Sequence, residues 1–395
     1  MSVHKIKERV FEVGAAHYDR RLFDELIPLP DGTTYNAYLI SGSEKIALID
    51  TVDPGKKEVL FENLESLGIE KIDYIISQHA EQDHSGSIPF VLEKYPMAKV
   101  VTNKKCRGFL QDLLHIEDDN FIIVDDGDTL SLGDKTLQFI LTPWVHWPET
   151  MVTYLVEDKI MFTCDFFGSH YAGATVFVRD ESELIDDAKR YYAEIMMPFR
   201  AQIKRNLEKI EKFDIEIIAP SHGSVYRKPE IIINAYKDWI SDTVENTVVI
   251  PYVSMHGSTE RIVYYLVNRL VERGIDVKPY NLTVTDTGKL AMALVDAATV
   301  ILASPQVLAG AHPEAAYAAF LMNALRPKTK NIGVVGSYGW GGRMTEQLMG
   351  LLSNIKAHVF EPLLIKGYPG KEDYEKITEL ADRIKERHIE LGILK

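Results

Sequence analysis

The sequence contains few cysteines and fewer basic than acidic residues. Among its 395 residues are two cysteines, Cys106 and Cys164, and no CxxC pair. A disulfide framework, a zinc ribbon and a four-cysteine iron–sulfur centre are therefore not expected within this chain. Lysine and arginine number 44 against 58 aspartates and glutamates, which gives a net charge of −14. A general nucleic-acid or anionic-membrane surface would need a basic excess, so we expect neither partner.

The sequence also lacks long hydrophobic runs. No stretch reaches the ~18 consecutive apolar residues that a membrane-spanning helix needs. The N-terminal segment MSVHKIKERVFEVGAAHYDRR has no apolar core of signal-peptide length. Together with the scarcity of cysteine, these absences favour a cytoplasmic location.

The first part of the chain predicts mixed sheets covered by helices. The hydrophobic fraction of 46% can supply two cores, and the length allows two domains of ~100–200 residues each. Before residue 247, strand-like runs and helical patterns alternate irregularly, with hairpin signals in 36–50 and 150–168. This pattern is typical of an αββα layering.

After residue 247, strands and helices alternate strictly. The strand-like segments are 247–253, 276–282, 299–304, 331–339 and 358–365, and helical stretches begin near Thr259, Gly288, Pro313, Gly342 and Lys371. Five parallel strands with crossover helices predict a doubly wound, flavodoxin-like α/β domain. We therefore expect two domains, residues 1–247 and 248–395.

Histidines and carboxylates follow the strand-like runs of the first domain. The stretch SQHAEQDHSG follows the apolar run IDYIIS, and three further polar residues follow later runs. These candidate ligands are His79, Glu81, Asp83, His84, His146, Asp165 and His222. Strand ends on one edge of a sheet converge, so these side chains can meet. Imidazoles and carboxylates without a thiolate suit two ions of iron, manganese or zinc, and the high carboxylate content favours redox iron.

The ligand pattern resembles a known domain family. HxExDH at 79–84, followed by His146, Asp165 and His222, resembles the metallo-β-lactamase-like domain. Hydrolases of that superfamily usually carry HxHxDH, whereas Glu81 replaces the second histidine here. This exchange, with a flavodoxin-like domain behind it, resembles the flavodiiron proteins (A-type flavoproteins) over essentially the whole chain. The resemblance implies an N-terminal αββα di-iron domain and a C-terminal FMN-binding domain.

The resemblance also implies roles for individual residues. One iron would be bound by His79, Glu81 and His146, the other by Asp83, His84 and His222, with Asp165 as the bridge. Some family members leave the residue that matches His84 off the metal. Tyr191 and Tyr192 would supply a catalytic phenol over the irons, unless both pack within a helix. Asp50 would orient a ligand imidazole, and Asp24 stands where many relatives have a histidine.

A second polar cluster follows the strands of the second domain. The segment YVSMHGSTERI runs from a strand through a loop into a helix, whose N-terminus can hold a phosphate without Lys or Arg. The motifs GxxxxGK and GxGxxG are absent. The loop resembles the monophosphate site of flavodoxins, which implies FMN, although a polar helix cap is the simpler alternative. The expected FMN-binding residues are Ser254, Met255, His256, Gly257, Ser258, Thr259, Ser304, Pro305, Gln306, Val307, Leu308, Ser337, Tyr338, Gly339, Trp340, Gly341 and Gly342.

Together the two clusters imply an oxidoreductase. FMN would relay electrons from rubredoxin, or from another donor such as a reduced deazaflavin, to two irons per chain that reduce O2 to water, NO to N2O, or both. The resemblance implies a head-to-tail homodimer or a dimer of dimers. One alternative is a dinuclear-metal hydrolase of the metallo-β-lactamase superfamily, which Glu81 and the flavin loop disfavour. A non-catalytic FMN electron carrier is another, which the complete ligand set disfavours.

Overall fold

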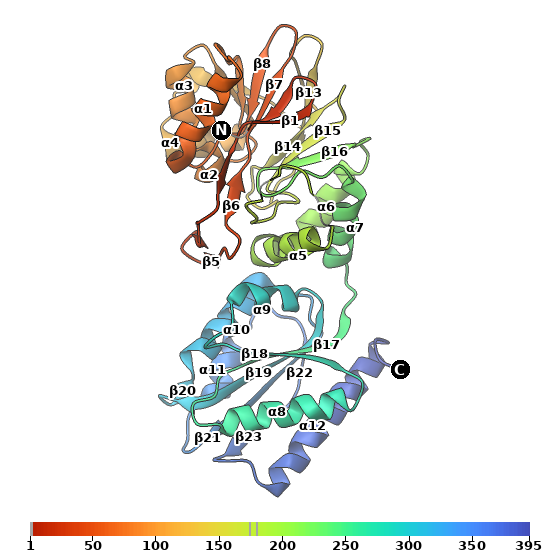
Figure 1. Cartoon of the computed structure of the whole chain (residues 1–395). Helices are drawn as coiled ribbons and strands as arrows, with labels where there is room; N and C mark the ends of the chain where they lie inside the picture. The colour runs from red at the N-terminus through yellow and green to blue at the C-terminus, as the bar shows by residue number, and fades with distance from the viewer. Residues whose placement is uncertain (1–2, 174, 179–180) are drawn as a thin grey trace. The chain divides into compact units, whose positions relative to one another are not determined.

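The computed structural model describes residues 3–173, 175–178 and 181–395 (Figure 1). The chain divides into two compact units, Met1–Tyr192 with Phe199–Ile240, and Ala193–Pro198 with Ser241–Lys395. This division falls a few residues before the boundary expected at 247, because β17 (Glu245–Tyr252) already belongs to the second unit.

The first unit contains two main sheets. One has the order β1-β2-β7-β8-β9-β10-β11, and the other has the order β12-β13-β14-β15-β16. The strands of the first sheet are β1 (His4–Lys7), β2 (Val10–Glu12), β7 (Tyr38–Ser41), β8 (Ile46–Ile49), β9 (Tyr74–Ile76), β10 (Lys99–Thr102) and β11 (Phe121–Ile123). Those of the second are β12 (Thr129–Ser131), β13 (Thr136–Leu141), β14 (Met151–Leu155), β15 (Ile160–Cys164) and β16 (Ile217–Pro220).

Side-chain alternation along the strands gives the first sheet two apolar faces. In β8, Ala47 and Ile49 belong to the core between the sheets, whereas Leu48 belongs to the core under the helices. Those helices are α1 (Lys57–Ser66), α3 (Ile88–Lys94) and α4 (Lys104–Leu114). Helix α6 (Arg200–Ile210) lies on the second sheet, to which it is joined by a hydrogen bond of 2.8 Å from Lys209 Nζ to Leu141 O. Helix α7 (Pro229–Ile240) packs beside α6. The predicted αββα layering is confirmed.

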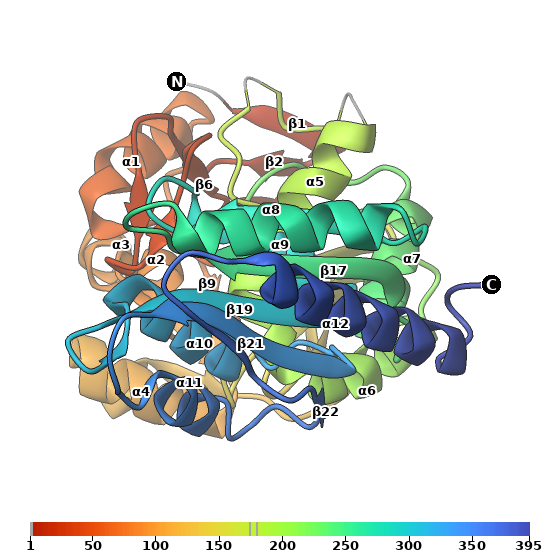
Figure 2. The ribbon, with the colours of Figure 1, turned by 90° about the horizontal axis from the view of Figure 1, so that it is seen from below.

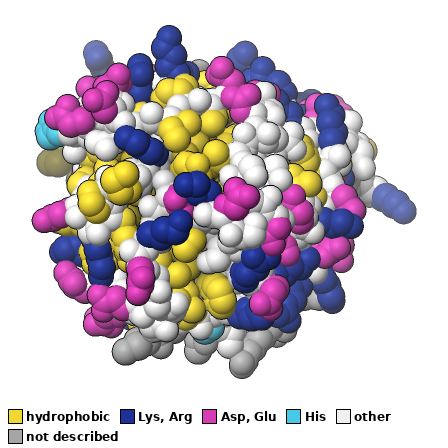
Figure 3. All heavy atoms as spheres, turned by 90° about the horizontal axis from the view of Figure 1, so that it is seen from above, with side chains coloured by type: hydrophobic (Ala, Val, Ile, Leu, Met, Phe, Trp, Pro, Cys, Tyr) yellow, Lys and Arg dark blue, Asp and Glu magenta, His cyan; other side chains and the backbone are white. Residues whose placement is uncertain are grey.

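Shorter elements complete the first unit. Two hairpins pair β3 (Ala15–His17) with β6 (Thr33–Tyr35) and β4 (Leu22–Phe23) with β5 (Ile27–Pro28). The helical segments are α2 (Gln82–Ser85) and α5 (Glu181–Tyr191). A π-helical turn, Tyr192–Met196, follows α5, and all of it except Tyr192 groups with the second unit. On the face drawn in Figure 3, basic and acidic side chains are interspersed around a strip of hydrophobic ones, so the charge of that face is of mixed sign.

The second unit is a doubly wound sheet. Its order is β18-β17-β19-β21-β22 with parallel pairing, which is the 2-1-3-4-5 order of flavodoxin-like domains. The remaining strands are β18 (Asp276–Asn281), β19 (Ala297–Val307), β20 (Gly310–Ala311), β21 (Asn331–Tyr338), β22 (His358–Val359) and β23 (Leu363–Lys366). The strand predicted at 358–365 is split into β22 and β23, because Pro362 between them has no N–H to donate.

Helices cover both faces of this sheet. On one face, α8 (Ser258–Val271) and α12 (Lys371–Glu390) bury Ile262 and Ile384 in one core. On the other face, α9 (Thr287–Leu294), α10 (Pro313–Leu325) and α11 (Met344–Leu351) share a second core. Figure 2 shows β17, β19 and β21 side by side between these helices. No helix within the described ranges combines the length and apolar composition that crossing a membrane requires.

Phe162 tests how much the core between the two sheets stabilises the first unit. It is fully buried there, with its ring 5.0 Å from that of Tyr38. We expect Phe162→Ala to lower the free energy of unfolding of this unit by about 3–5 kcal/mol, because it leaves a cavity. Chemical denaturation followed by circular dichroism measures the change. The matched variant Phe90→Ala removes a ring that is 37% exposed, and it should cost far less.

Candidate metal centre

The loops that follow the strands converge on one cluster in the first unit. His79 follows β9, and the short helix α2 presents the ligands of the same loop. His146 follows β13, and Asp165 follows β15 directly. His222 follows β16, which pairs parallel with β15 so that Cys164 faces Pro220. Parallel pairing therefore places two of the ligands at the same strand ends.

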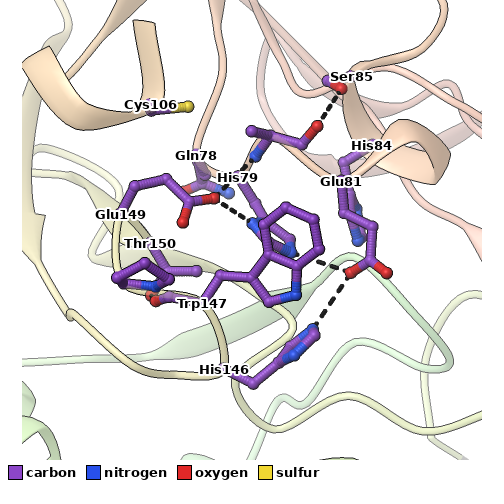
Figure 4. Close-up of polar contacts among 12 residues, drawn as sticks. Gln78, His79, Glu81, His84, Ser85, Cys106, His146, Trp147, Glu149 and Thr150 are labelled. Carbon is purple, nitrogen blue, oxygen red and sulfur yellow. Dashed lines mark hydrogen bonds and ion pairs between the residues drawn. The ribbon is translucent and has the colours of Figure 1, made fainter. Parts of the chain in front are cut away.

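Four side chains form the first half of the cluster, and Figure 4 labels His79, Glu81 and His146 among them. Glu81 Oε2 lies 3.0 Å from His79 Nε2 and 3.2 Å from His146 Nε2. Asp165 Oδ2 lies 3.5 Å from His79 Nε2 and 3.4 Å from His146 Nε2. Their ligand atoms all lie within 4.8 Å of one another, which is the spacing that a single ion can fill.

The second half uses the other oxygen of the same aspartate. Asp165 Oδ1 lies 3.2 Å from His84 Nε2 and 3.3 Å from His222 Nε2. Asp83 Oδ1 lies 3.3 Å from His84 Nε2, and Asp83 Oδ2 lies 3.1 Å from His222 Nε2. Asp165 thus turns one oxygen toward each half, as a bridging ligand must. All seven predicted ligands, His84 included, meet at this site.

The donor atoms fit a pair of cations. Both carboxylate oxygens of Asp83, Oδ2 of Asp165 and Nε2 of His84 are buried without a hydrogen-bond partner among the described residues. Leaving such groups unsatisfied is costly, and bound cations would remove that cost. Cys164 Sγ lies within 4.8 Å of His84 and Asp165 ligand atoms, but burial raises the pKa of its thiol well above the usual value. The site is therefore a nitrogen and oxygen site suited to iron, manganese or zinc.

The carboxylates hold protons on the ligand histidines. Burial by itself would lower the pKa of His222, but the nearby carboxylates of Asp165 and Asp83 raise it to about 10. Burial would also lower the pKa of His146, but the nearby carboxylates of Asp165 and Glu81 raise it to about 9. Metal binding must displace these protons, so the affinity for metal is expected to fall as the pH is lowered.

The carboxylate that touches a ligand imidazole is Glu149 rather than the expected Asp50. His79 Nδ1 donates to Glu149 Oε1 at 2.7 Å, whereas Asp50 accepts from the backbone N and the side-chain amide of Gln78, both at 2.8 Å. Sequence analysis missed Glu149. Its position three residues after His146 and just before a strand is the signal that was available.

The structure brings only one of the two predicted tyrosines to the cluster. Tyr191 is buried, and its hydroxyl donates to Asp165 Oδ1 at 2.8 Å. Tyr192 lies outside the cluster: its ring packs 5.4 Å from that of Tyr236 and 5.3 Å from that of Trp239, and its hydroxyl donates to Trp239 O. Adjacent residues of a helix point in directions about 100° apart, so both cannot face one site.

A further histidine, also missed, lies beside the cluster. The ring of His170 is 5.2 Å from that of His222 and 4.8 Å from that of Tyr191, and its Nδ1 is 3.0 Å from Thr33 Oγ1. Burial, together with the charge of His222, lowers its pKa well below the usual value. Asp24, which stands where many relatives have a histidine, lies exposed between β4 and β5. Partial burial of its carboxylate, and then the charges of the ligand carboxylates, raise its pKa.

A separate pocket in the second unit lies at the N-terminus of α8. It is lined by Ser254, Met255, His256, Ser258, Thr259, Pro305, Gln306, Ser337, Tyr338, Gly339 and Gly367, of which only Gly367 was not predicted. The predicted residues that do not line it are Gly257, Ser304, Val307, Leu308, Trp340, Gly341 and Gly342. Gly257 caps α8 with φ +85°, and the Ser304 hydroxyl binds the next carbonyl instead. His312 is the N-cap of α10, where its side chain accepts from the backbone N–H of Glu314.

The bridging geometry of Asp165 can be tested by metal content. Asp165→Asn should reduce bound metal from two ions per chain to fewer than one, because a neutral amide cannot bridge two cations as a carboxylate does. Elemental analysis of the purified proteins gives the count. Tyr192→Phe, which alters a ring outside the cluster, should keep the full complement. Two tightly bound ions in Asp165→Asn would contradict the bridging assignment.

Comparisons with known proteins agree with this geometry. Residues 33–223 match the family model described as ODP family beta lactamase. The chain is 35% identical over 391 residues to a nitric oxide reductase of Moorella thermoacetica, covering 97% of this chain and 98% of the relative. It is 32% identical over 363 residues to a coenzyme F420H(2) oxidase of Methanothermobacter marburgensis, covering 88% and 89%.

Two solved structures resemble this chain over almost its whole length. The rubredoxin oxygen:oxidoreductase of Desulfovibrio gigas superposes with a TM-score of 0.95 at 30% identity, covering 99% of both chains. The flavodiiron protein of Giardia intestinalis superposes with a TM-score of 0.93 at 29% identity, covering 99% of this chain and 98% of that one. With its Glu81-containing ligand set and its flavodoxin-like second unit, the chain belongs to the flavodiiron protein family of oxidoreductases.

Proposed function

We propose that this protein reduces O2 to water, NO to N2O, or both, at two non-haem irons per chain, with FMN relaying the electrons. The observation that carries the proposal is the geometry of Asp165, whose two oxygens lie 3.2–3.5 Å from imidazole nitrogens of separate ligand sets. The names of the relatives, nitric oxide reductase and rubredoxin-oxygen oxidoreductase, support the two gases as substrates.

The domains divide the work. Residues 1–247 form the di-iron domain and residues 248–395 the FMN domain. When bound, reduced irons and reduced FMN together supply the electrons that gas reduction requires. The residues of the chain hold these groups in place: Tyr191, through its hydrogen bond to Asp165 Oδ1, fixes which carboxylate oxygen faces each ligand set. Trp147 packs edge-on against His79, with ring centroids 5.0 Å apart, and limits access of water to that side.

The pocket at α8 suits the phosphate of FMN. Ser254 Oγ accepts from the backbone N–H groups of Gly257 and Glu260, both at 3.2 Å, which shapes the loop. The N–H groups of Ser258 and Thr259, in the first turn of the 14-residue helix α8, are then available to an anion at the positive end of the helix dipole. The hydroxyl of Thr259 is 2.9 Å from that of Ser337, which joins this loop to the end of β21.

Electrons reach FMN from a separate protein or carrier in the cytoplasm, such as rubredoxin or a reduced deazaflavin. The names rubredoxin-oxygen oxidoreductase and coenzyme F420H(2) oxidase among the relatives support these donor classes. Two apolar side chains on the segments that carry pocket-lining residues, Leu308 and Trp340, are 87% and 66% exposed. Exposed apolar side chains beside a binding site are typical of contact surfaces, so they support docking of a donor or of a second copy in a head-to-tail dimer.

Gas consumption under anaerobic handling tests the proposed activity. The iron- and FMN-loaded protein, supplied with chemically reduced rubredoxin, should consume O2 or NO, as followed with gas-specific electrodes. His79→Asn should abolish consumption and keep the flavin, whereas Tyr192→Phe should retain both. Failure of the fully loaded protein to consume either gas would contradict the proposal. Undiminished consumption by His79→Asn would point to reaction at the flavin alone, and a colourless zinc protein without flavin would favour a hydrolase.

The identity of the flavin is tested at the helix N-terminus. Ser258→Asp places a negative charge where the phosphate is expected, so FMN affinity should fall more than tenfold while riboflavin affinity changes little. An acidic residue is favourable in the first turn of a helix, so stability should be kept. Quenching of flavin fluorescence measures both affinities, and Lys376→Gln on the exposed side of α12, which also changes the net charge by −1, is the charge-matched control. An equal loss of both flavins would contradict phosphate recognition at this site.

A further inference from the structure

The two ligand sets contain the same types of donor atom, but the groups that hydrogen-bond to their imidazoles from outside differ. Apart from the shared Asp165, each set consists of two imidazoles and one carboxylate. Behind these ligands, His79 Nδ1 bonds to a carboxylate oxygen of Glu149 at 2.7 Å, whereas His222 Nδ1 bonds to the neutral backbone carbonyl of Thr34 at 2.6 Å. The asymmetry between the sets therefore arises one layer outside the ligands.

Glu149 is a buried carboxylate whose negative charge is directed at His79. Its side chain is fully buried, and its other contact through Oε1 is the backbone N–H of Ala80 at 3.1 Å. Oε2 is buried without a hydrogen-bond partner among the described residues. Among the described residues, His79 is the sole ion-pair partner of Glu149. Figure 4 shows the chain of contacts from Glu149 through His79 to Glu81.

The backbone around Glu149 is held from two sides. Asn103 Nδ2, at the start of α4, donates to the carbonyl oxygen of Glu149 at 2.6 Å. The neighbouring Met151 N donates to Gln78 O at 3.0 Å, which ties the same loop to the residue before His79. Asp50, the other buried carboxylate near the ligands, accepts from donors of Gln78 with both oxygens and makes no hydrogen bond to a ligand imidazole among the described residues. Burial raises the pKa of Asp50, and the charge of His84 opposes that rise. Glu149 is therefore positioned to act on one imidazole in particular.

The chemistry of this contact is directional. A carboxylate oxygen only accepts, so His79 Nδ1 donates its proton to Glu149, and Nε2, which faces Glu81 and Asp165, is the nitrogen that can bind a metal once its own proton is displaced. An anionic partner makes an imidazole a stronger electron donor to a metal, and such partners tune both metal affinity and reduction potential. The neutral carbonyl behind His222 fixes that ring without adding charge.

We propose that Glu149 is a positioning residue that holds His79 in one tautomer. Through its charge, it also gives the iron bound by His79, Glu81 and His146 the lower reduction potential of the two irons. This inference rests on the proposed di-iron function. It means that the pair accepts its electrons in a defined order, with the iron bound by Asp83, His84 and His222 reduced first and the iron on the Glu149 side second.

Glu149→Gln separates charge from geometry, because the amide oxygen can still accept from His79 Nδ1 while the negative charge is lost. In a redox titration of the iron- and FMN-loaded protein, EPR reports the half-reduced iron pair and absorbance reports the flavin. The wild type should show two separated iron steps. In Glu149→Gln the more negative step should move to a less negative potential, which lowers the maximum amount of the half-reduced pair while the first step stays in place.

Two further variants complete the design. Glu149→Asp keeps the charge on a shorter side chain, so its iron steps should lie between those of the wild type and Glu149→Gln. Glu12→Gln removes another buried carboxylate of the same unit, one that accepts from Gly14 N and touches no ligand, and should leave both steps unchanged. If Glu149→Gln does not fold or load iron, Glu149→Asp decides: steps that are still separated but closer together than in the wild type support the proposal, and steps that match the wild type or merge overturn it.

Several results would overturn the role of Glu149. These are iron steps in Glu149→Gln that match the wild type, a shift of the first step alone, or an equal shift of both. If the wild type itself binds no iron pair, both the proposed function and this inference fail. If the wild type is loaded and active but its iron steps do not respond to Glu149, the inference fails and the proposed function stands.

Discussion

The structure of the first unit depends on one buried aspartate that serves two ligand sets. Asp165 can do so only because β15 and β16 run parallel and side by side, with Ser221 N bonded to Cys164 O at 2.8 Å. This bond holds the chain segments that carry Asp165 and His222 next to each other. The sheets, the loops and the tyrosine that surround the carboxylate all act to keep its two oxygens in fixed directions.

Burying so many polar groups is unfavourable unless each finds a partner. The chain supplies partners for the outer atoms of the ligands, such as Glu149 for His79 and the carbonyl of Thr34 for His222. The inner atoms are left facing one another, and several have no partner among the described residues. A polar centre that is satisfied on its outside and unsatisfied on its inside is the physical signature of a site built for cations.

The pocket of the second unit differs from the metal centre in the chemistry of its lining. Its pocket contains no ligand histidine cluster and relies on hydroxyls, backbone N–H groups and the start of α8. Such a site suits a phosphate-bearing planar cofactor rather than a metal. In the proposed function the two units therefore contribute complementary chemistry to a single oxidoreductase, one holding metal and the other holding flavin.

The sequence alone was sufficient for the fold class and for the candidate metal ligands that the structure brings together. Strict strand–helix alternation after residue 247 indicates a doubly wound sheet, and polar residues directly after apolar runs indicate where strand ends meet. The pattern HxExDH with Glu81 distinguished the family from hydrolases that share the fold. These features are local in the chain, so they can be read without knowing what packs against what.

Tertiary structure decided what depends on contacts between distant segments. Only packing shows that Tyr191 rather than Tyr192 reaches Asp165, because the two are neighbours in sequence and differ by a rotation about a helix. Only packing assigns the support of His79 to Glu149, 70 residues away in the chain, and not to Asp50. Gly339 lines the pocket and the next residue, Trp340, is exposed, because the path of the loop turns the two residues in different directions. Periodicity and spacing in the sequence contain no information on such side-chain orientations. The orientations are set by which apolar surfaces pack against one another and exclude water.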